Sequence, residues 1–419
     1  MELLDTIIKN GIVVTQNRER EILKVNIGIK DGKIVKLGNH FTQAEQIIDA
    51  DNAMITPAYL NAHIHFGEYY LRGYKGNLST EEYIALGEKF YRAFLKEQDE
   101  IRSSSIDNVL CESIQNGTLT VLGVRGWPNV PRFGVNAYLG YPIMRSEKLS
   151  AYMNRFEENF YALKAYGNVE YFLGLHSLNW IDEDALKAAA AFLNDHQNIK
   201  VSLHICETEA EVLSITQKYK VSPIQLLDSL GLLNENTLLV HCNYLKQEDI
   251  DLIRKRRASV AVCHSSNLKL GNRPCAIDIL LENDINVMIA TDGPATSDSL
   301  SLLDAVRISA LISHLDAQTL YDMITINPAK YLKINTGSVQ IGNKADLLFY
   351  DRNSLHITYR NSILENLIYS PGGRPRDVMK DGSFIIKDYR FTDNIEEPVL
   401  REKNRIIQLI EKSAGQGLS

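Results

Sequence analysis

Cysteine is scarce in this 419-residue chain, and it does not occur in the pairs that a disulfide scaffold or a zinc ribbon needs. The five cysteines stand alone at positions 111, 206, 242, 263 and 275, with no C-x-x-C pair. This pattern excludes both of those protein classes. We therefore expect reduced thiols, which are typical of a cytosolic protein.

Long apolar runs and basic runs are also missing. No stretch reaches the roughly 18 apolar residues of a membrane-spanning helix, and the opening residues, MELLDTIIKNG, lack the pattern of a signal peptide. A formal net charge of −7, a pI of about 5.9 and the lack of a basic cluster argue against nucleic acid or an anionic membrane as the main partner. We expect a soluble, cytoplasmic protein.

The chain also lacks internal repeats, low-complexity tracts and proline-rich linkers. Short β-rich segments with Asn-Gly and Asp-Gly turns fill the first 55 residues, and the same texture returns after residue 336. Neither end alone has enough strands to bury a sheet face. We therefore predict one β-sandwich built from 1–55 and 337–392, followed by a C-terminal helix and tail at 393–419.

Between these ends, residues 56–336 alternate apolar strand-like runs with helical patterns. A strand ending at residue 65 and six further candidates give seven βα units, and an eighth strand is expected near 138–144. The middle region is thus predicted to fold as a (β/α)8 barrel. The other candidate strands are 119–125, 169–176, 199–206, 237–243, 258–264 and 285–292, and the clearest helices are 80–96, 182–194, 207–219, 247–256 and 300–314.

The stretch 54–68, MITPAYLNAHIHFGE, carries the first candidate site. If it ends in a β-strand, His63 and His65 lie on one face, because side chains two apart share a face. Two imidazoles placed in this way can bind a divalent metal. One His-x-His among ten histidines is expected by chance about one time in four. The pair therefore needs support from the rest of the chain.

That support comes from the predicted carboxyl ends of the other strands, where a barrel has its active site. Three histidines and one aspartate suit zinc or ferrous iron and leave a position for water, which the metal activates as a nucleophile. Glu207 is placed to move a proton in the same mouth, although an acid in a first helical turn also favours the helix dipole. A single buried histidine is usually structural, but that does not explain the recurrence at His63, His65, His176, His204, His241, His264 and Asp292.

These residues and their surroundings resemble the amidohydrolase superfamily, within it the metal-dependent aminohydrolase branch of cytosine, guanine and S-adenosylhomocysteine deaminases and triazine hydrolases. The resemblance implies a (β/α)8 hydrolase that deaminates an amino-substituted N-heterocycle and releases ammonia. Similar proteins are often dimers, so a homodimer is possible here. The matching segments, in family order, are TPAYLNAHIHF, LRG, LHSLNW, SLHICETEAEV, LVHCNYL, VCHSSNLKLG, TDGPATSDSL and INPAKYLKINTGSVQIGNKADLLFYD.

The resemblance also implies roles for individual residues. One divalent ion, zinc or iron, is expected on His63, His65, His204 and Asp292. Glu207 would protonate a ring nitrogen, His241 would orient the attacking water together with Asp292, and His176 would touch the substrate.

Three residues on predicted mouth loops are further candidates for substrate binding: Arg72, Trp127 and Asn267. Each has an alternative, namely a structural role for Arg72, an aromatic loop packed on itself for Trp127, and a turn cap for Asn267.

Several alternatives are weighed against this prediction. No lysine ends a predicted strand, which argues against a two-metal site with a carboxylated lysine, and the H-x-E and P-C-x-x-C motifs of the cytidine-deaminase fold are absent. Nucleoside-type members carry a glutamate for the ribose hydroxyls where this chain has Arg92, so the resemblance does not extend to that contact. Hydrolysis of a ring amide or a carbon–halogen bond, and a non-catalytic metal-containing binding protein, remain as alternatives.

Overall fold

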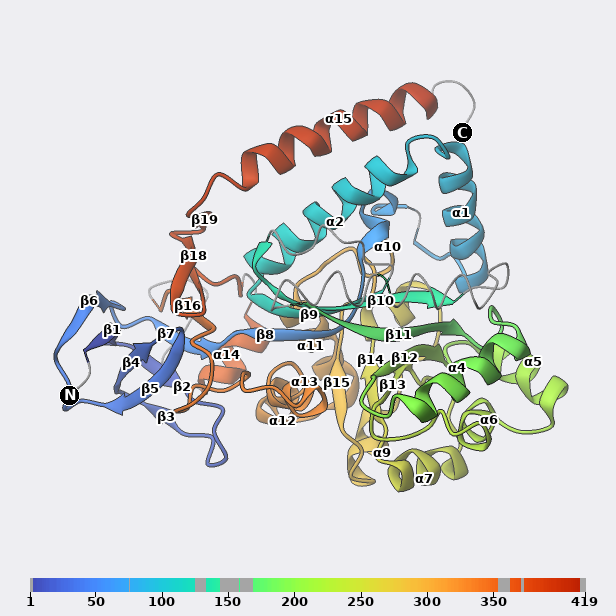
Figure 1. The fold of residues 1–419 in the computed structure, drawn as a ribbon, viewed down its shortest axis with the longest axis horizontal. Helices are drawn as coiled ribbons and strands as arrows, with labels where there is room; N and C mark the ends of the chain where they lie inside the picture. Colours follow the sequence, from blue (N-terminus) through green and yellow to red (C-terminus); the bar gives the residue numbers. More distant parts are fainter. Residues whose placement is uncertain are drawn as a thin grey trace.

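The centre of the molecule is an eight-stranded sheet in the order β15-β14-β13-β12-β11-β10-β9-β8, in which every neighbouring pair is parallel (Figure 1). The computed structural model describes residues 3–74, 76–124, 133–143, 158, 169–352, 362–370 and 373–414. The predicted (β/α)8 barrel is confirmed, with its eighth strand at β10. The strands are β8 (Tyr59–His65), β9 (Thr118–Val124), β10 (Asn136–Ile143), β11 (Val169–Ser177), β12 (Val201–Ile205), β13 (Thr237–His241), β14 (Ser259–Val262) and β15 (Val287–Ile289).

The barrel closes between β8 and β15 through a buried asparagine. Asn61 is fully buried, its Nδ2 donates to Thr291 Oγ1 at 2.7 Å, and its Oδ1 accepts from Thr291 N at 3.2 Å. One residue further, Asp292 N donates to the carbonyl of His63 at 3.1 Å. A buried amide must satisfy its polar atoms, so this pairing fixes the seam. The closure therefore holds Asp292 beside His63.

Helices surround the barrel, and side-chain caps define where several of them begin. Ser79 and Glu82 form a capping box at α1, and the Thr208 side chain accepts from Glu211 N at the start of α5. The helices around the barrel are α1 (Thr80–Ala93), α2 (Gln98–Gln115), α4 (Glu183–Asp195), α5 (Glu209–Tyr219), α6 (Pro223–Ser229), α7 (Gln247–Arg256), α8 (His264–Lys269), α9 (Ile277–Glu282), α10 (Pro294–Ser297), α11 (Leu302–Ser313), α12 (Ala317–Asp322), α13 (Ile326–Leu332) and α14 (Ile363–Tyr369).

Beside the barrel, strands from both chain ends form two sheets, seen in blue and red at the left of Figure 1. The order in one is β5-β4-β1-β6 and in the other β19-β18-β17-β16-β7-β2-β3, so the second sheet combines the two ends. Side chains from both sheets, including Ile8, Ile27, Ile55 and Phe349, share one buried core. β7 straddles the domain boundary predicted after residue 55. The strands are β1 (Leu4–Lys9), β2 (Ile12–Val14), β3 (Ile22–Leu23), β4 (Asn26–Lys30), β5 (Lys33–Gly38), β6 (Ala44–Asp49), β7 (Met54–Pro57), β16 (Leu347–Tyr350), β17 (Asp377–Lys380), β18 (Ser383–Lys387) and β19 (Arg390–Phe391).

The last helix, α15 (Glu396–Ala414), returns over the barrel and packs along α2 (Figure 1). Its fully buried Ile406 joins Phe90 of α1 and Ile101 of α2 in one apolar cluster. The chain end thereby braces the two helices that follow the first barrel strand. Over the described part of the chain, no helix has the length and apolarity that crossing a membrane requires. All five cysteines lie within the described residues and are buried.

A close contact between β9 and the end of β8 fixes the backbone next to His65. Phe66, the residue after His65, is fully buried, and its ring lies against Gly123 of β9. A Cβ built on Gly123 would come within 1.7 Å of the Phe66 ring. The glycine is therefore required by close packing.

We expect Gly123→Ala to destabilise the fold by about 1–3 kcal/mol, the usual cost of overpacking a buried site. The measurement is the free energy of unfolding from chemical denaturation. Gly76→Ala is the matched control, because a Cβ at Gly76 meets no atom within 4 Å. Equal stabilities for the two variants would contradict this account of the Phe66 packing.

Candidate metal-dependent active site

Three imidazoles meet at the carboxyl ends of β8 and β12. His63 Nε2 lies 3.1 Å from His65 Nε2, His65 Nε2 lies 3.1 Å from His204 Nε2, and His204 Nε2 lies 3.2 Å from His63 Nε2. All three side chains are buried. Two nitrogens bound to one tetrahedral zinc ion at about 2.0–2.1 Å would be about 3.3 Å apart. The spacing of the three atoms therefore matches a shared metal ion.

The opposite ring nitrogens show which atoms carry the protons. His204 Nδ1 lies 2.7 Å from the carbonyl oxygen of His176, which can only accept, so this nitrogen carries the hydrogen. His65 Nδ1 lies 2.6 Å from Glu68 Oε1 and donates to that carboxylate. Burial lowers the pKa of His204 well below its ordinary value, so the ring is neutral. Its Nε2 is then a bare lone pair.

These tautomers test whether the residues fit a metal. When His65 is neutral like His204, the contact of 3.1 Å between His65 Nε2 and His204 Nε2 joins two lone pairs that have no hydrogen between them. Such a contact is repulsive, and a cation between the nitrogens relieves it. Burial also lowers the pKa of His63 to about 4, which leaves that ring neutral near pH 7. The donor set of neutral imidazoles fits a divalent ion such as zinc.

Asp292 completes the cluster from the seam of the barrel. Its Oδ1 lies 3.3 Å from His65 Nε2 and 3.5 Å from His63 Nε2. Its Oδ2 accepts hydrogen bonds from Ser266 Oγ at 2.5 Å and Thr296 Oγ1 at 3.2 Å. Because the hydroxyls occupy one oxygen, the other is turned toward the imidazoles.

Glu207 and His241 form the second half of the site. Glu207 Oε2 lies 3.7 Å from His241 Nε2, and Glu207 Oε1 accepts from Thr80 Oγ1 at 3.2 Å. Burial raises the pKa of the Glu207 carboxyl. A carboxyl group that keeps its proton to higher pH is suited to act as an acid near neutral pH.

A chain of amide groups orients His241. Its Nδ1 lies 2.9 Å from Asn267 Oδ1, Asn267 Nδ2 donates to Asn243 Oδ1 at 2.7 Å, and Asn243 Nδ2 donates to the carbonyl of Glu207 at 2.9 Å. Because Asn267 uses its nitrogen on Asn243, its oxygen must accept from His241 Nδ1–H. In a neutral His241 ring this contact leaves Nε2 without a hydrogen, and the residue lines the cavity.

The backbone is unusual where these side chains leave the strands. His241 and Asp292 have φ angles of +76° and +62°, in the left-handed region that non-glycine residues avoid. Each such residue costs on the order of 1–3 kcal/mol. This backbone conformation turns both side chains away from the direction that a regular strand would give them.

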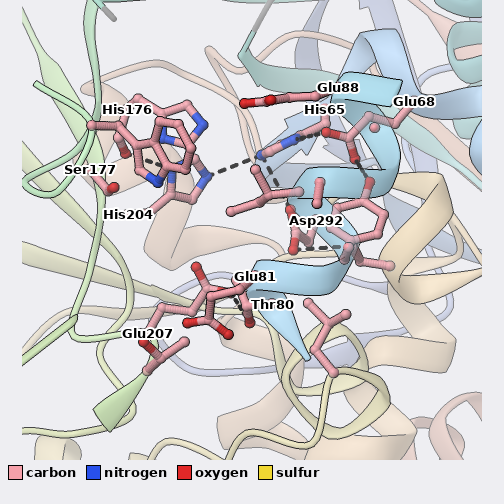
Figure 2. Close-up of a pocket in the computed structure, with 18 of the residues that line it drawn as sticks. His65, Glu68, Thr80, Glu81, Glu88, His176, Ser177, His204, Glu207 and Asp292 are labelled. Carbon is pink, nitrogen blue, oxygen red and sulfur yellow. Dashed lines mark hydrogen bonds and ion pairs between the residues drawn. The ribbon is translucent and has the colours of Figure 1, made fainter. Parts of the chain in front are cut away.

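A cavity of about 960 Å³ opens onto the cluster. In Figure 2, His204 lies beside His176 and Ser177 on one side, His65 and Asp292 lie on the other side, and Thr80 and Glu207 lie below them. Trp180 and Tyr83 add aromatic surface to the wall, and Glu81 and Glu88 add carboxylates. This volume is large enough for a drug-sized ligand.

The structure treats the remaining predicted site residues differently. His176 lines the cavity, with its ring 5.1 Å from that of His204. Arg72 pairs with Glu112 at 2.8 Å, and Asn267 is buried against His241; neither lines the cavity formed by the described residues. Trp127 lies outside the described residues, as do all residues from 125 to 132. His264 bonds Ser309 Oγ and the carbonyl of Cys275, both at 3.0 Å, away from the cluster.

Sequence reasoning missed the carboxylates and hydroxyls that support these groups. Glu68, Thr80, Tyr83 and Glu211 all line the cavity or contact a predicted site residue. Glu68 stands three residues after His65, which was its only local signal. Arg92, the position of the missing ribose contact, pairs with Glu88 at 3.4 Å with its side chain 78% exposed.

Together, the closed parallel barrel and the histidine cluster at its carboxyl end define a barrel hydrolase of the metal-dependent type. The chain belongs to the amidohydrolase family, whose model matches residues 54–385. The predicted family membership is thus confirmed, and members of this family depend on metal ions.

Similar proteins match this chain over nearly its whole length. A 5-methylthioadenosine/S-adenosylhomocysteine deaminase of Caldicellulosiruptor saccharolyticus is 28% identical, over 98% of this chain and 100% of that one. A 5'-deoxyadenosine deaminase of Methanosarcina mazei is also 28% identical, over 96% and 98%. Among solved structures, an adenosine deaminase of Xanthomonas campestris with bound zinc has a TM-score of 0.88 at 23% identity, covering 97% of this chain and 99% of that chain. At that identity, the structural match supports the fold.

One more buried acid lies beneath the site. Glu211 Oε2 accepts from Glu207 N at 2.9 Å, and burial raises the pKa of Glu211 to about 8. In the unfolded chain this carboxyl group has a pKa near its ordinary value of 4.5. Between these two pKa values the unfolded state releases a proton that the folded state retains. Glu211 therefore favours folding below about pH 4.5, and this contribution is lost as the pH rises toward 8.

We expect Glu211→Gln to flatten this pH dependence. Relative to that variant, wild-type protein should lose up to a few kcal/mol of stability between pH 5 and pH 8.5, since each pKa unit corresponds to about 1.4 kcal/mol. The measurement is chemical denaturation of metal-free protein at both pH values. Glu209→Gln, an exposed acid on the same helix, should follow the wild type. If Glu211→Gln also follows it, Glu211 ionises normally in the folded protein.

Proposed function

We propose that this amidohydrolase is a metal-dependent hydrolytic deaminase of an amino-substituted N-heterocycle, a nucleobase, nucleoside or related ring. The observation that carries the proposal is the convergence of bare imidazole nitrogens beside a buried carboxyl group, at the end of one large cavity. A metal site next to a proton donor is what hydrolysis of a carbon–nitrogen bond requires. The relatives named above as deaminases support the reaction type.

We assign the metal to His63, His65, His204 and Asp292, and propose zinc as the ion. The neutral nitrogens and the carboxylate are donors that suit zinc, and ferrous iron is the alternative. When bound, the ion would lower the pKa of a water molecule so that hydroxide is available near neutral pH.

The remaining chemistry belongs to Glu207 and His241. The raised pKa of Glu207 keeps its proton available for the ring nitrogen next to the carbon that carries the amine. Protonation there prevents negative charge from building up on the ring as water adds to that carbon. His241 Nε2, left bare by Asn267, accepts the proton of the attacking water together with Asp292. The proton taken up by His241 and Asp292 then passes to the departing amine, and the hydroxyl proton of the adduct returns to Glu207 as the carbonyl forms and ammonia leaves.

The cavity wall suits a flat, polar substrate. His176 and Trp180 lie near each other, with ring centroids 6.3 Å apart, and present aromatic surface close to His204. Planar heterocycles pack well on such surfaces. The side chains of Ser177 and Asn179, which also line the cavity, offer polar partners for ring substituents.

We expect the metal-replete protein to release ammonia from at least one member of a panel of purines, pyrimidines, pterins and their nucleosides. Product mass should show loss of ammonia with gain of one oxygen, since hydrolysis of a ring amide would add a whole water. Glu207→Gln should lower kcat by about 10²–10⁴, the usual contribution of a general acid.

The control for this substitution is Glu209→Gln, which removes an exposed carboxylate two residues away and should keep its activity. Glu207→Gln should still bind one metal ion per chain. Full activity of Glu207→Gln would exclude the proposed acid. A panel in which no compound loses ammonia would exclude the deaminase.

Metal removal provides a second test. Dialysis against a chelator should abolish turnover, and one equivalent of zinc should restore it, because the ion supplies the nucleophile. Elemental analysis should give about one metal ion per chain in the wild type and much less in His204→Ala. Undiminished turnover by demonstrably metal-free protein would contradict the assignment. Restoration by ferrous iron in place of zinc would change only the identity of the ion.

A further inference from the structure

Glu68 is a buried carboxylate with partners on two sides. It belongs to the short 3-10 helix η1 (Phe66–Leu71), and the residue is only 3% exposed. Its Oε1 accepts from His65 Nδ1 at 2.6 Å, and its Oε2 accepts from Tyr83 Oη at 2.7 Å (Figure 2). Burying a carboxylate is costly unless such charge-assisted hydrogen bonds compensate it. Both oxygens are therefore committed, one to the cluster and one to α1.

The surrounding backbone leaves space for this carboxylate. Gly293, the residue after Asp292, has Glu68 Oε2 where a Cβ would be, at 2.2 Å from the built position. A side chain at residue 293 would displace Glu68. Residue 293, next to Asp292, is thus a glycine because the Glu68 carboxylate, the partner of His65, occupies the space that a side chain would need.

The helix η1 is itself anchored at several points. Ser105 of α2 donates from Oγ to the carbonyl of Phe66 at 2.6 Å and accepts from Tyr69 N at 3.0 Å. Tyr91 of α1 donates to the carbonyl of Gly67. These contacts fix the backbone on either side of Glu68, so the carboxylate reaches His65 from a rigid base.

We propose that Glu68 is a positioning residue that fixes the tautomer and ring plane of His65, and that Tyr83 couples this contact to the wall of the substrate cavity. The inference rests on the proposed metal site. A carboxylate that accepts from the distal nitrogen of a ligating histidine raises its basicity and orients its ring. The Glu68 contact gives His65 a bare Nε2 at the cluster.

Tyr83 gives the arrangement a second consequence. It lies in the first turns of α1 and lines the cavity, so a ligand that shifts this wall also acts on the hydrogen bond to Glu68. Cavity occupancy and metal affinity are then linked through three side chains in series. By thermodynamic reciprocity, a change at either end is felt at the other.

The test measures zinc affinity by competition with a chromophoric chelator in Glu68→Ala, Glu68→Gln and Tyr83→Phe. Glu68→Ala should weaken zinc binding by about 10–100-fold, the usual effect of losing such a partner. Glu68→Gln keeps an acceptor for His65 and loses the charge, so its effect should be smaller. Tyr83→Phe removes one hydrogen bond to Glu68 and should weaken binding least. The visible spectrum of the cobalt-substituted Glu68 variants should shift, because the ring of His65 is reoriented.

Tyr70→Phe is the matched control. Tyr70 is also a half-buried tyrosine near this cluster, but its hydroxyl bonds Ser104 Oγ at 2.6 Å, and its removal should leave zinc affinity unchanged. Wild-type zinc affinity and an unshifted cobalt spectrum in folded Glu68→Gln and Tyr83→Phe would overturn the proposal, even if Glu68→Ala fails to fold. If the wild type binds no zinc, or if His204→Ala binds as much zinc as the wild type, the proposed function fails instead.

Discussion

The contact on which the site depends is that between His65 Nε2 and His204 Nε2, two lone pairs held 3.1 Å apart. Left to themselves, buried neutral imidazoles would turn so that a hydrogen lies between them. Acceptors on the far side of each ring prevent this, since the carbonyl of His176 and the carboxylate of Glu68 claim the Nδ1 hydrogens. When both rings are neutral, the fold therefore holds two lone pairs together, and a bound cation would make that contact favourable.

Barrel topology supplies the framework that holds this contact. Parallel strands end at one rim, so residues from β8, β12, β13 and the seam after β15 meet without any long connection. The rim also carries a backbone cost, because His241 and Asp292 both have positive φ angles there. Only the large buried core beneath can offset such strain. The buried strands provide the stability, and the side chains of the site follow the ends of those strands.

The sequence predicted what depends on periodicity and chain order. Alternation along β8 placed His63 and His65 together, and the apolar runs located seven strands, because both signals are local. The eighth strand was expected near 138–144 only because a barrel needs one more. It failed where partners are distant in the chain. The hydrogen-bond donor to Asn267 Oδ1 is His241 Nδ1, 26 residues away, and Arg72 pairs with Glu112, 40 residues further along the chain. Nothing near Asn267 or Arg72 distinguishes a residue that faces the cavity from one that supports it. The metal-binding roles assigned to His63, His65, His204 and Asp292 remain predictions, which the geometry supports.

Helix α1 explains why the supporting residues escaped notice. Thr80 donates to Glu207 Oε1, and Tyr83, one turn later, donates to Glu68 Oε2, so a single turn contacts both halves of the site. Residues three apart on a helix share a face, yet neither a threonine nor a tyrosine in a capped amphipathic helix suggests chemistry. The same turn lines the cavity. Because this turn lines the cavity and also contacts the proposed acid and the partner of a proposed ligand, a substitution that changes the cavity wall there also alters the proposed catalytic groups.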